Sequence, residues 1–237
     1  MNGFVMALQF LTRLPTPTIV ADEHAFAGSM RWFPAVGLVV GVLIAGAAFV
    51  GATWGDSWVA ALAALVMWVC VTGALHLDGL GDFADAGGAA HKDRERVLAV
   101  LADPHVGSFG VVAIVLQLLA KLVLLHALVD TDTVWPVVLV PFAARIGPLV
   151  WTWWIAPLHA GLAARFRSAI GVPVLAEWGA ALILASLVSP VLLVTPLLIA
   201  WWGWQVRRTI GGISGDGHGA GIELIETALL LSMAIWG

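Results

Sequence analysis

Residues 58–88 read WVAALAALVMWVCVTGALHLDGLGDFADAGG, and this stretch decides the class of fold. About twenty apolar residues come first, and three aspartates, Asp78, Asp82 and Asp85, follow directly. A bilayer core needs roughly 20 apolar residues for each helix that crosses it. The stretch therefore predicts a membrane helix with a cluster of negative charge at its end.

The composition extends this interpretation to the whole chain. The 237 residues are 61% hydrophobic and only 11% charged, whereas a soluble domain carries about 25% charged residues. Too little polar surface remains to cover a globule in water, so the sequence predicts an integral membrane protein. The Lys and Arg residues are few and scattered, without the basic stripe of a nucleic-acid-binding protein, so no nucleic-acid partner is expected.

The apolar segments predict an all-α fold, a polytopic helical bundle of about seven transmembrane helices that forms a single domain over residues 1–237. A short interfacial helix is expected at the N-terminus, before the prolines at 15 and 17. The expected spans are 33–54, 58–77, 109–129, 133–155, 174–188, 190–204 and 220–236. Prolines at 136, 141 and 148 predict kinks in the fourth span. Segment 174–204 is either two thin spans or a broken hairpin.

The distribution of positive charge predicts the orientation. If the N-terminus is cytoplasmic, the outer turns near residues 56, 131 and 189 contain no Lys or Arg, and nine of the 11 basic residues fall on the inner side. This agrees with the positive-inside rule. The polar segments 76–108 and 207–219 then share the cytoplasmic face of the inner membrane, where we expect one site. The bilayer is a partner, and the sequence is compatible with a homo-oligomer.

The spacing of Asp78, Asp82 and Asp85 places the three carboxylates on one face of a helix. Such carboxylates repel one another, and partial desolvation increases the repulsion. A divalent cation among them would relieve it. Mg²⁺ takes oxygen ligands, keeps several waters and bridges carboxylates to substrate phosphates. The spacing therefore favours a Mg²⁺ site, and a solvated polar loop is the alternative.

Residues 207–226, RRTIGGISGDGHGAGIELIE, form a second polar segment. A glycine-rich loop that leads into a helix can bind phosphate through its backbone N–H groups. Asp216 would complete the metal site of Asp78, Asp82 and Asp85. A flexible connector, with Glu223 and Glu226 reaching the interface, is the alternative. The predicted substrate-binding residues are Gly107, Arg207, Arg208, Gly211, Gly212, Ser214 and Gly215.

Two cations, Lys121 and Arg145, are predicted near the middle of adjacent spans. Charged groups at that depth are functional candidates and need partners. They would contact phosphate oxygens or the aspartates, or form structural ion pairs. The candidate catalytic residues are Asp82, His76 and Arg145, with Arg145 stabilising phosphate charge and His76 or an aspartate accepting a proton.

With these motifs assembled, the chain resembles the cobalamin synthase family, the adenosylcobinamide-GDP ribazoletransferases. The likeness rests on LQFLTRLPTP, FPAVGLVVG, HLDGLGDFADA, DPHVGSFG and GGISGDGHGAGIELIE. The chain departs from the family pattern at Ala86, at Ser214, where Thr is usual, and at His218, where Leu is usual. The resemblance implies a Mg²⁺-dependent membrane enzyme. It would join adenosylcobinamide-GDP to α-ribazole or its 5′-phosphate and release GMP.

Two other functions remain as alternatives. A CDP-alcohol phosphotransferase also uses clustered aspartates, but its motif places them in one stretch with an Ala-Arg pair. Here the spacing of the aspartates differs, and no Ala-Arg pair follows them at the right place. An ion-coupled transporter would place Lys121, Arg145 and the aspartates on its pathway. Transporters often show two repeated halves, and the sequence has no such symmetry.

Overall fold

The computed structural model describes residues 2–17, 23–89, 94–131, 133–158, 166–167 and 169–236, with only the backbone of 23–25. The described chain folds into helices with short connections. In chain order they are α1 (Asn2–Leu11), α2 (Glu23–Ser29), η1 (Met30–Trp32), α3 (Phe33–Trp54), α4 (Ser57–Thr72), α5 (Leu75–Ala89), α6 (Arg94–Leu101), α7 (Ser108–Asp130), η2 (Trp135–Leu139), α8 (Val140–Ala144), α9 (Ile146–Trp154), α11 (Val172–Ala185), η3 (Pro190–Val194), α12 (Thr195–Thr209) and α13 (Gly215–Trp236).

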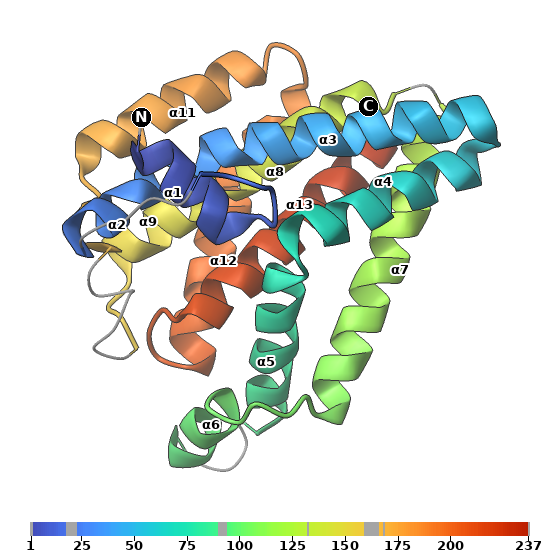
Figure 1. Cartoon of the computed structure of the whole chain (residues 1–237). Coiled ribbons are helices and arrows are strands. Elements are labelled where there is room, and N and C mark those ends of the chain that lie inside the picture. The colour runs from blue at the N-terminus through green and yellow to red at the C-terminus, as the bar shows by residue number, and fades with distance from the viewer. Residues whose placement is uncertain are drawn as a thin grey trace.

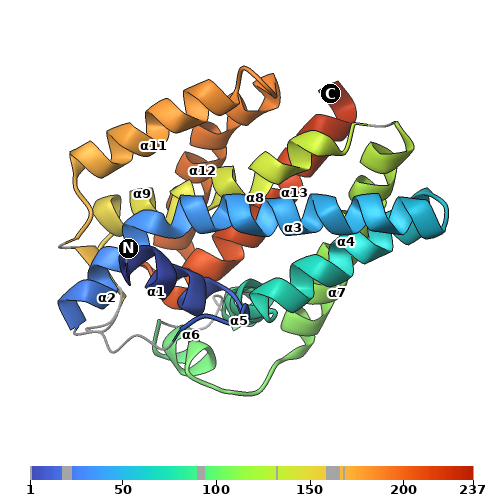
Figure 2. The same cartoon turned by 45° about the horizontal axis from the view of Figure 1, so that its top comes forward.

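Helix α13 occupies the middle of the bundle. It packs against α5, α7, α8, α9 and α12, and it passes diagonally beneath α3 and α8 in Figure 2. Helices α3 and α4 lie side by side across the bundle, while α5, α6 and the first half of α7 project away from them (Figure 1). The last helix therefore contacts most of the elements that carry polar residues.

Four helical segments are long and apolar enough to cross a bilayer: Phe26–Trp54, Ser108–Asp130, Trp135–Trp154 and Gly215–Trp236. A fifth crossing results if α4 and α5 are counted as one broken span. These segments make the chain an integral membrane protein. The predicted all-α bundle is confirmed, but the count of seven spans is not, because α11 has only 14 residues and η3 precedes a 15-residue α12. A double crossing by 174–204 stays a prediction.

The predicted continuous helix 58–77 is wrong in its second half. Helix α4 ends at Thr72, and α5 leaves it at an angle of 84°. Gly73 and Ala74 both have positive φ, 61° and 58°, a conformation that is common for glycine at helix ends and uncommon for alanine. The break turns the acidic motif out of the line of α4. Helix α5 consequently lies outside the four long spans.

Two glycines of α3 allow it to contact the kinked span closely. A Cβ at Gly41 would overlap the carbonyl of Val138, and one at Gly37 would overlap that of Pro141. Small residues at helix interfaces permit this approach of backbones in membrane proteins. The kinks predicted from the prolines are present, since the span divides into η2, α8 and α9.

We expect Gly41→Ala to destabilise the protein, because the new methyl group has to displace the backbone at Val138. Overpacking of this kind costs about 1–3 kcal/mol. Gly46→Ala on the same helix is the matched control, since a Cβ there meets nothing within 4 Å. Thermal unfolding in detergent should show a lower midpoint for Gly41→Ala alone; equal midpoints for the two variants would contradict the packing.

Candidate active site at the contact of α5 and α13

The two polar segments meet where α5 touches the start of α13. A Cβ at Gly79 would lie 2.9 Å from the Cα of Asp216, and one at Gly219 would lie 3.3 Å from the Cα of His76. Both glycines are buried. They therefore let the two backbones approach each other.

This approach brings together carboxylates that are far apart in the sequence. Asp78 and Asp216 line one cavity of about 180 Å³. Burial, and then repulsion from Asp216, Asp78 and Asp85, raise the pKa of Asp82 to about 6. The predicted face of acidic residues on one helix is confirmed, and Asp216 adds its charge from α13. The result is a local excess of negative charge.

Asp85 differs from the other acidic residues because backbone donors already surround it. Its carboxylate accepts the N–H of Gly107 at 2.7 Å and the N–H of Gly110 at 2.9 Å. Gly107 is the N-cap of α7, so Asp85 caps that helix and complements its dipole. Gly107 was predicted to contact substrate. Its N–H group does bind an anion, but that anion is the carboxylate of Asp85.

The acidic cluster fits Mg²⁺ in one specific way. Among the described residues, no three His, Cys, Asp or Glu side chains lie close enough to form a complete metal site. Mg²⁺ does not require one, because it is usually bound by one or two carboxylates together with water and substrate phosphates. Burial and the neighbouring carboxylates raise the pKa of Asp82, so a cation bound beside this group would be favourable. Asp78, Asp82 and Asp216 are the residues that would hold the cation.

The second polar segment is more helical than the sequence indicated. Helix α13 begins at Gly215, so Asp216 lies in its first turn. Ser214 accepts the N–H of Gly217 at 3.0 Å and acts as a cap. The true loop is short: Gly211 has φ of 80°, and the buried Gly212 packs on the backbone of Leu158.

Three arginines form a separate basic pocket beside this loop. Arg207 and Arg208 lie in the last turn of α12, and with Arg94 of α6 they line a pocket of about 260 Å³. Both α12 arginines are exposed and lie over tryptophan rings. Because guanidinium groups suit phosphate, this pocket is the candidate site for the phosphates of a substrate.

His76 faces the acidic cavity, and Arg145 lies behind it. The Nη2 of Arg145 is 3.5 Å from Nδ1 of His76. A guanidinium only donates, so Nδ1 is the acceptor and the proton of the neutral ring is on Nε2. A second positive charge on the ring would be repelled by Arg145. His76 lines the cavity, and a ring with its proton on Nε2 suits a hydrogen-bond donor better than the predicted base.

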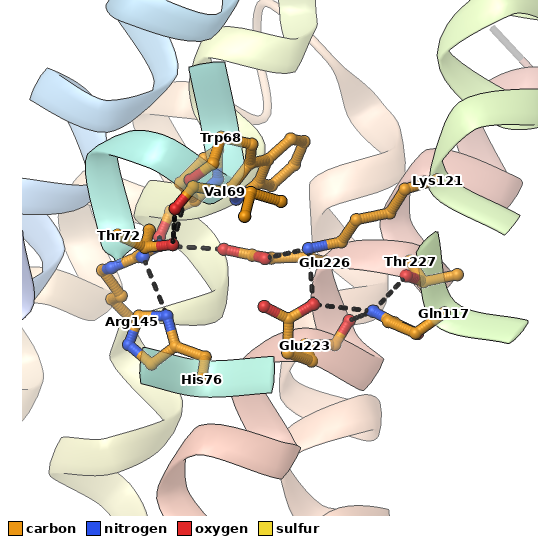
Figure 3. Close-up of polar contacts among 11 residues, drawn as sticks. Trp68, Val69, Thr72, His76, Gln117, Lys121, Arg145, Glu223, Glu226 and Thr227 are labelled. Atoms are coloured by element: carbon orange, nitrogen blue, oxygen red, sulfur yellow. Dashed lines mark hydrogen bonds and ion pairs between the residues drawn. The ribbon is translucent and has the colours of Figure 1, made fainter. Parts of the chain in front are cut away.

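Arg145 and Lys121 belong to a fully buried ion network (Figure 3). Glu226 accepts from Arg145 at 2.9 Å and from Lys121 at 2.7 Å, and Glu223 accepts from Lys121 at 2.7 Å. Gln117 also donates to Glu223 at 2.9 Å. The structural ion pair is thus the observed arrangement, and Arg145 does not line the cavity. The idea of a flexible connector with interfacial glutamates is wrong, since both are buried.

Sequence comparison shows which family has this arrangement of segments. A model of the cobalamin-5-phosphate synthase family matches residues 3–234. The chain belongs to this family. The two alternatives, a CDP-alcohol phosphotransferase and an ion-coupled transporter, therefore have no support. The cobalamin-5-phosphate synthase match covers α1 to α13, so it includes the acidic motif, the ion network and the arginine pocket.

Individual relatives agree with the cobalamin-5-phosphate synthase match. The chain is 73% identical to an adenosylcobinamide-GDP ribazoletransferase of Novosphingobium aromaticivorans, over 100% of this chain and 98% of that protein. It is 49% identical to the Thiobacillus denitrificans protein of the same name, over 98% and 94% of the two chains. The Laribacter hongkongensis protein, also of that name, is 53% identical over 98% and 96%. No solved structure matches the chain.

Removing one cation of the ion network should destabilise the fold strongly. Lys121→Met leaves Glu223 and Glu226 opposite Arg145 alone, and an uncompensated buried charge costs about 3–5 kcal/mol. The double variant Lys121→Met/Glu223→Gln retains the pair of Arg145 and Glu226, so it should be more stable than the single variant. Denaturant unfolding in mixed micelles measures both; a double variant no more stable than Lys121→Met would contradict the charge balance.

The raised pKa of Asp82 predicts a pH-dependent stability without Mg²⁺. Because folding raises this pKa from 3.8 to about 6, the ionised group destabilises the folded protein. The penalty grows as pH rises through that window and is complete above it. Asp82→Asn should therefore raise the melting temperature at pH 7.5, and the gain should shrink toward pH 4.5. Glu95→Gln, at an exposed carboxylate of α6, should change neither value. A lower melting temperature for Asp82→Asn at pH 7.5 would refute the repulsion.

Proposed function

We propose that the chain joins adenosylcobinamide-GDP to α-ribazole, or to its 5′-phosphate, and releases GMP. The single observation that carries the proposal is the meeting of Asp78 on α5 with Asp216 on α13 at one cavity. The family membership and the printed activity of the relatives point to the same reaction. Clustered carboxylates beside a phosphate-binding pocket suit the cleavage of a pyrophosphate.

The metal part of the proposal follows from the charge of the site. Asp78, Asp82 and Asp216 would hold Mg²⁺, which, when bound, neutralises phosphate charge and favours displacement at phosphorus. Arg207, Arg208 and Arg94 would bind the guanosine side of the pyrophosphate, because their pocket lies next to the loop before α13. The acidic cavity then receives the other substrate.

The reaction balances with groups that this chain supplies. A ribose hydroxyl of α-ribazole forms a bond to the phosphorus linked to cobinamide. It is not the 5′-hydroxyl, because that oxygen carries the phosphate in the alternative substrate. The bond from that phosphorus to the bridging oxygen breaks, and GMP leaves with the electron pair. The hydroxyl proton passes to a carboxylate that lines the cavity, Asp78 or Asp216. His76 donates its Nε2–H to a substrate oxygen, and Arg145 is a positioning residue that fixes the ring of His76.

The orientation in the membrane completes the proposal. The acidic motif, the arginine pocket and α6 adjoin one another, and the distribution of Lys and Arg assigns this side to the cytoplasm. We propose that the active site faces the cytoplasm across the inner membrane. Segment 174–204 would then add the remaining two crossings of a seven-helix topology, and a homo-oligomer is compatible with this arrangement.

The purified protein in liposomes, given Mg²⁺, adenosylcobinamide-GDP and α-ribazole, should form GMP and adenosylcobalamin in equal amounts. Chelation of Mg²⁺ should stop the reaction, and added Mg²⁺ should restore it. Asp78→Asn and Asp216→Asn should each lower kcat by about 100-fold or more, on the scale of other groups that stabilise charge at a reacting centre.

Glu177→Gln is the control, because Glu177 is an exposed carboxylate of α11 that does not line the cavity. It should keep the rate within about twofold, since surface substitutions have small effects. An Asp216→Asn protein that turns over at the wild-type rate in saturating Mg²⁺ would refute the assignment of the site.

A further inference from the structure

The cavity of about 180 Å³ between α1, α3, α5 and α13 has two unlike walls. One wall carries the carboxylates of Asp78 and Asp216. The opposite wall is apolar and aromatic, with the rings of Phe10, Phe33 and Phe166. Neither the acidic motif nor the arginine pocket accounts for the aromatic wall, which comes from segments that the reaction mechanism above does not use.

The three phenylalanines form one connected aromatic surface. The ring centroids of Phe10 and Phe33 are 5.8 Å apart with nearly parallel planes, and Phe166 lies 6.2 Å from Phe33 and 6.4 Å from Phe10. Phe33 and Phe166 are buried. Such a surface binds a planar apolar ring by offset stacking or by edge-to-face contact. It offers no hydrogen-bond partner.

Two histidines that line the same cavity each have a buried ring nitrogen. Nε2 of His76 and Nδ1 of His218 have no hydrogen-bond partner among the described residues. The other nitrogen of His218 is 3.2 Å from Oγ1 of Thr152. A buried polar atom without a partner costs free energy, so these two nitrogens point to a ligand that carries a few polar atoms beside its apolar part.

We propose that this cavity binds the ribazole substrate, with its aromatic base against the phenylalanines and its ribose toward the aspartates. The inference rests on the function proposed above and names which substrate takes this site. The base of ribazole is a dimethylbenzimidazole, a planar apolar bicycle with one free ring nitrogen. The reacting ribose hydroxyl then lies toward Asp78 and Asp216, and the two imidazoles pair with polar atoms of the nucleoside.

The other large groups of the two substrates fit this cavity poorly. A cavity of about 150 Å³ holds a single benzene ring, so one of about 180 Å³ can take one aromatic ring of the base and excludes a corrin macrocycle. Guanine has donors and acceptors along its edges, and burying them against phenylalanine would leave them unpaired. Its phosphates need cations, which the pocket of Arg94, Arg207 and Arg208 provides elsewhere.

Steady-state kinetics with each substrate varied in turn test the proposal. Phe33→Leu and Phe166→Leu should raise the KM for α-ribazole by about tenfold, on the scale of one lost aromatic contact, and leave the KM for adenosylcobinamide-GDP within about twofold. Phe142→Leu is the matched control, because Phe142 is equally buried but lies outside the cavity. It should change neither KM.

Gly215→Leu is a second variant that tests the same cavity if the phenylalanine variants do not fold. Gly215 lines the cavity and is exposed, and a Cβ there meets nothing within 4 Å. The added side chain should raise the KM for α-ribazole alone. Wild-type protein that forms no GMP would refute the proposed function. Wild-type turnover combined with an unchanged KM for α-ribazole, or with a raised KM for adenosylcobinamide-GDP, would overturn only the present inference.

Discussion

The close contact between α5 and α13 is the constraint on which the site depends. Gly79 meets the backbone of Asp216, where a side chain has no room, and Gly219 meets that of His76, where a side chain would be tight. A larger separation of the two helices would move Asp216 away from Asp78, and the two carboxylates would no longer face one cavity. Glycine is required here because backbone approaches backbone. The arrangement of the carboxylates thus depends on how closely α5 and α13 pack.

The break between α4 and α5 makes this contact possible. A straight continuation of α4 would have carried the acidic motif along the bilayer span, whereas the 84° turn at Gly73 and Ala74 directs α5 toward the first turns of α13. Asp85 then fixes the far end of α5, because its carboxylate binds the amides that begin α7. Of the acidic residues of the motif, Asp85 is thereby used for structure, and Asp78 and Asp82 remain for the cation.

Some of these features could be predicted from the sequence, and the reason differs between residues. The helical spacing of Asp78, Asp82 and Asp85 is a local pattern, so their common face was predictable. The partner of Asp85 was not, because Gly107 follows 22 residues later and its approach depends on how α5 and α7 pack. Glu226 and Arg145 are 81 residues apart, and only the fold decides between ion pair and phosphate contact. The cluster of phenylalanines that lines the cavity could not be predicted from the sequence, because isolated phenylalanines are common in apolar segments.

Charge balance explains why two acidic systems so close together have different roles. Lys121 and Arg145 neutralise Glu223 and Glu226 deep in the bundle, where an unpaired charge would be strongly destabilising. Because both cations are used there, neither neutralises Asp78, Asp82 or Asp216. Burial, together with the negative charge at the α5–α13 contact, raises the pKa of Asp82. In the proposed reaction, a cation held by these carboxylates would relieve the repulsion and neutralise substrate phosphate. The buried ion pairs keep Lys121 and Arg145 away from Asp78, Asp82 and Asp216, which is compatible with the proposed metal site.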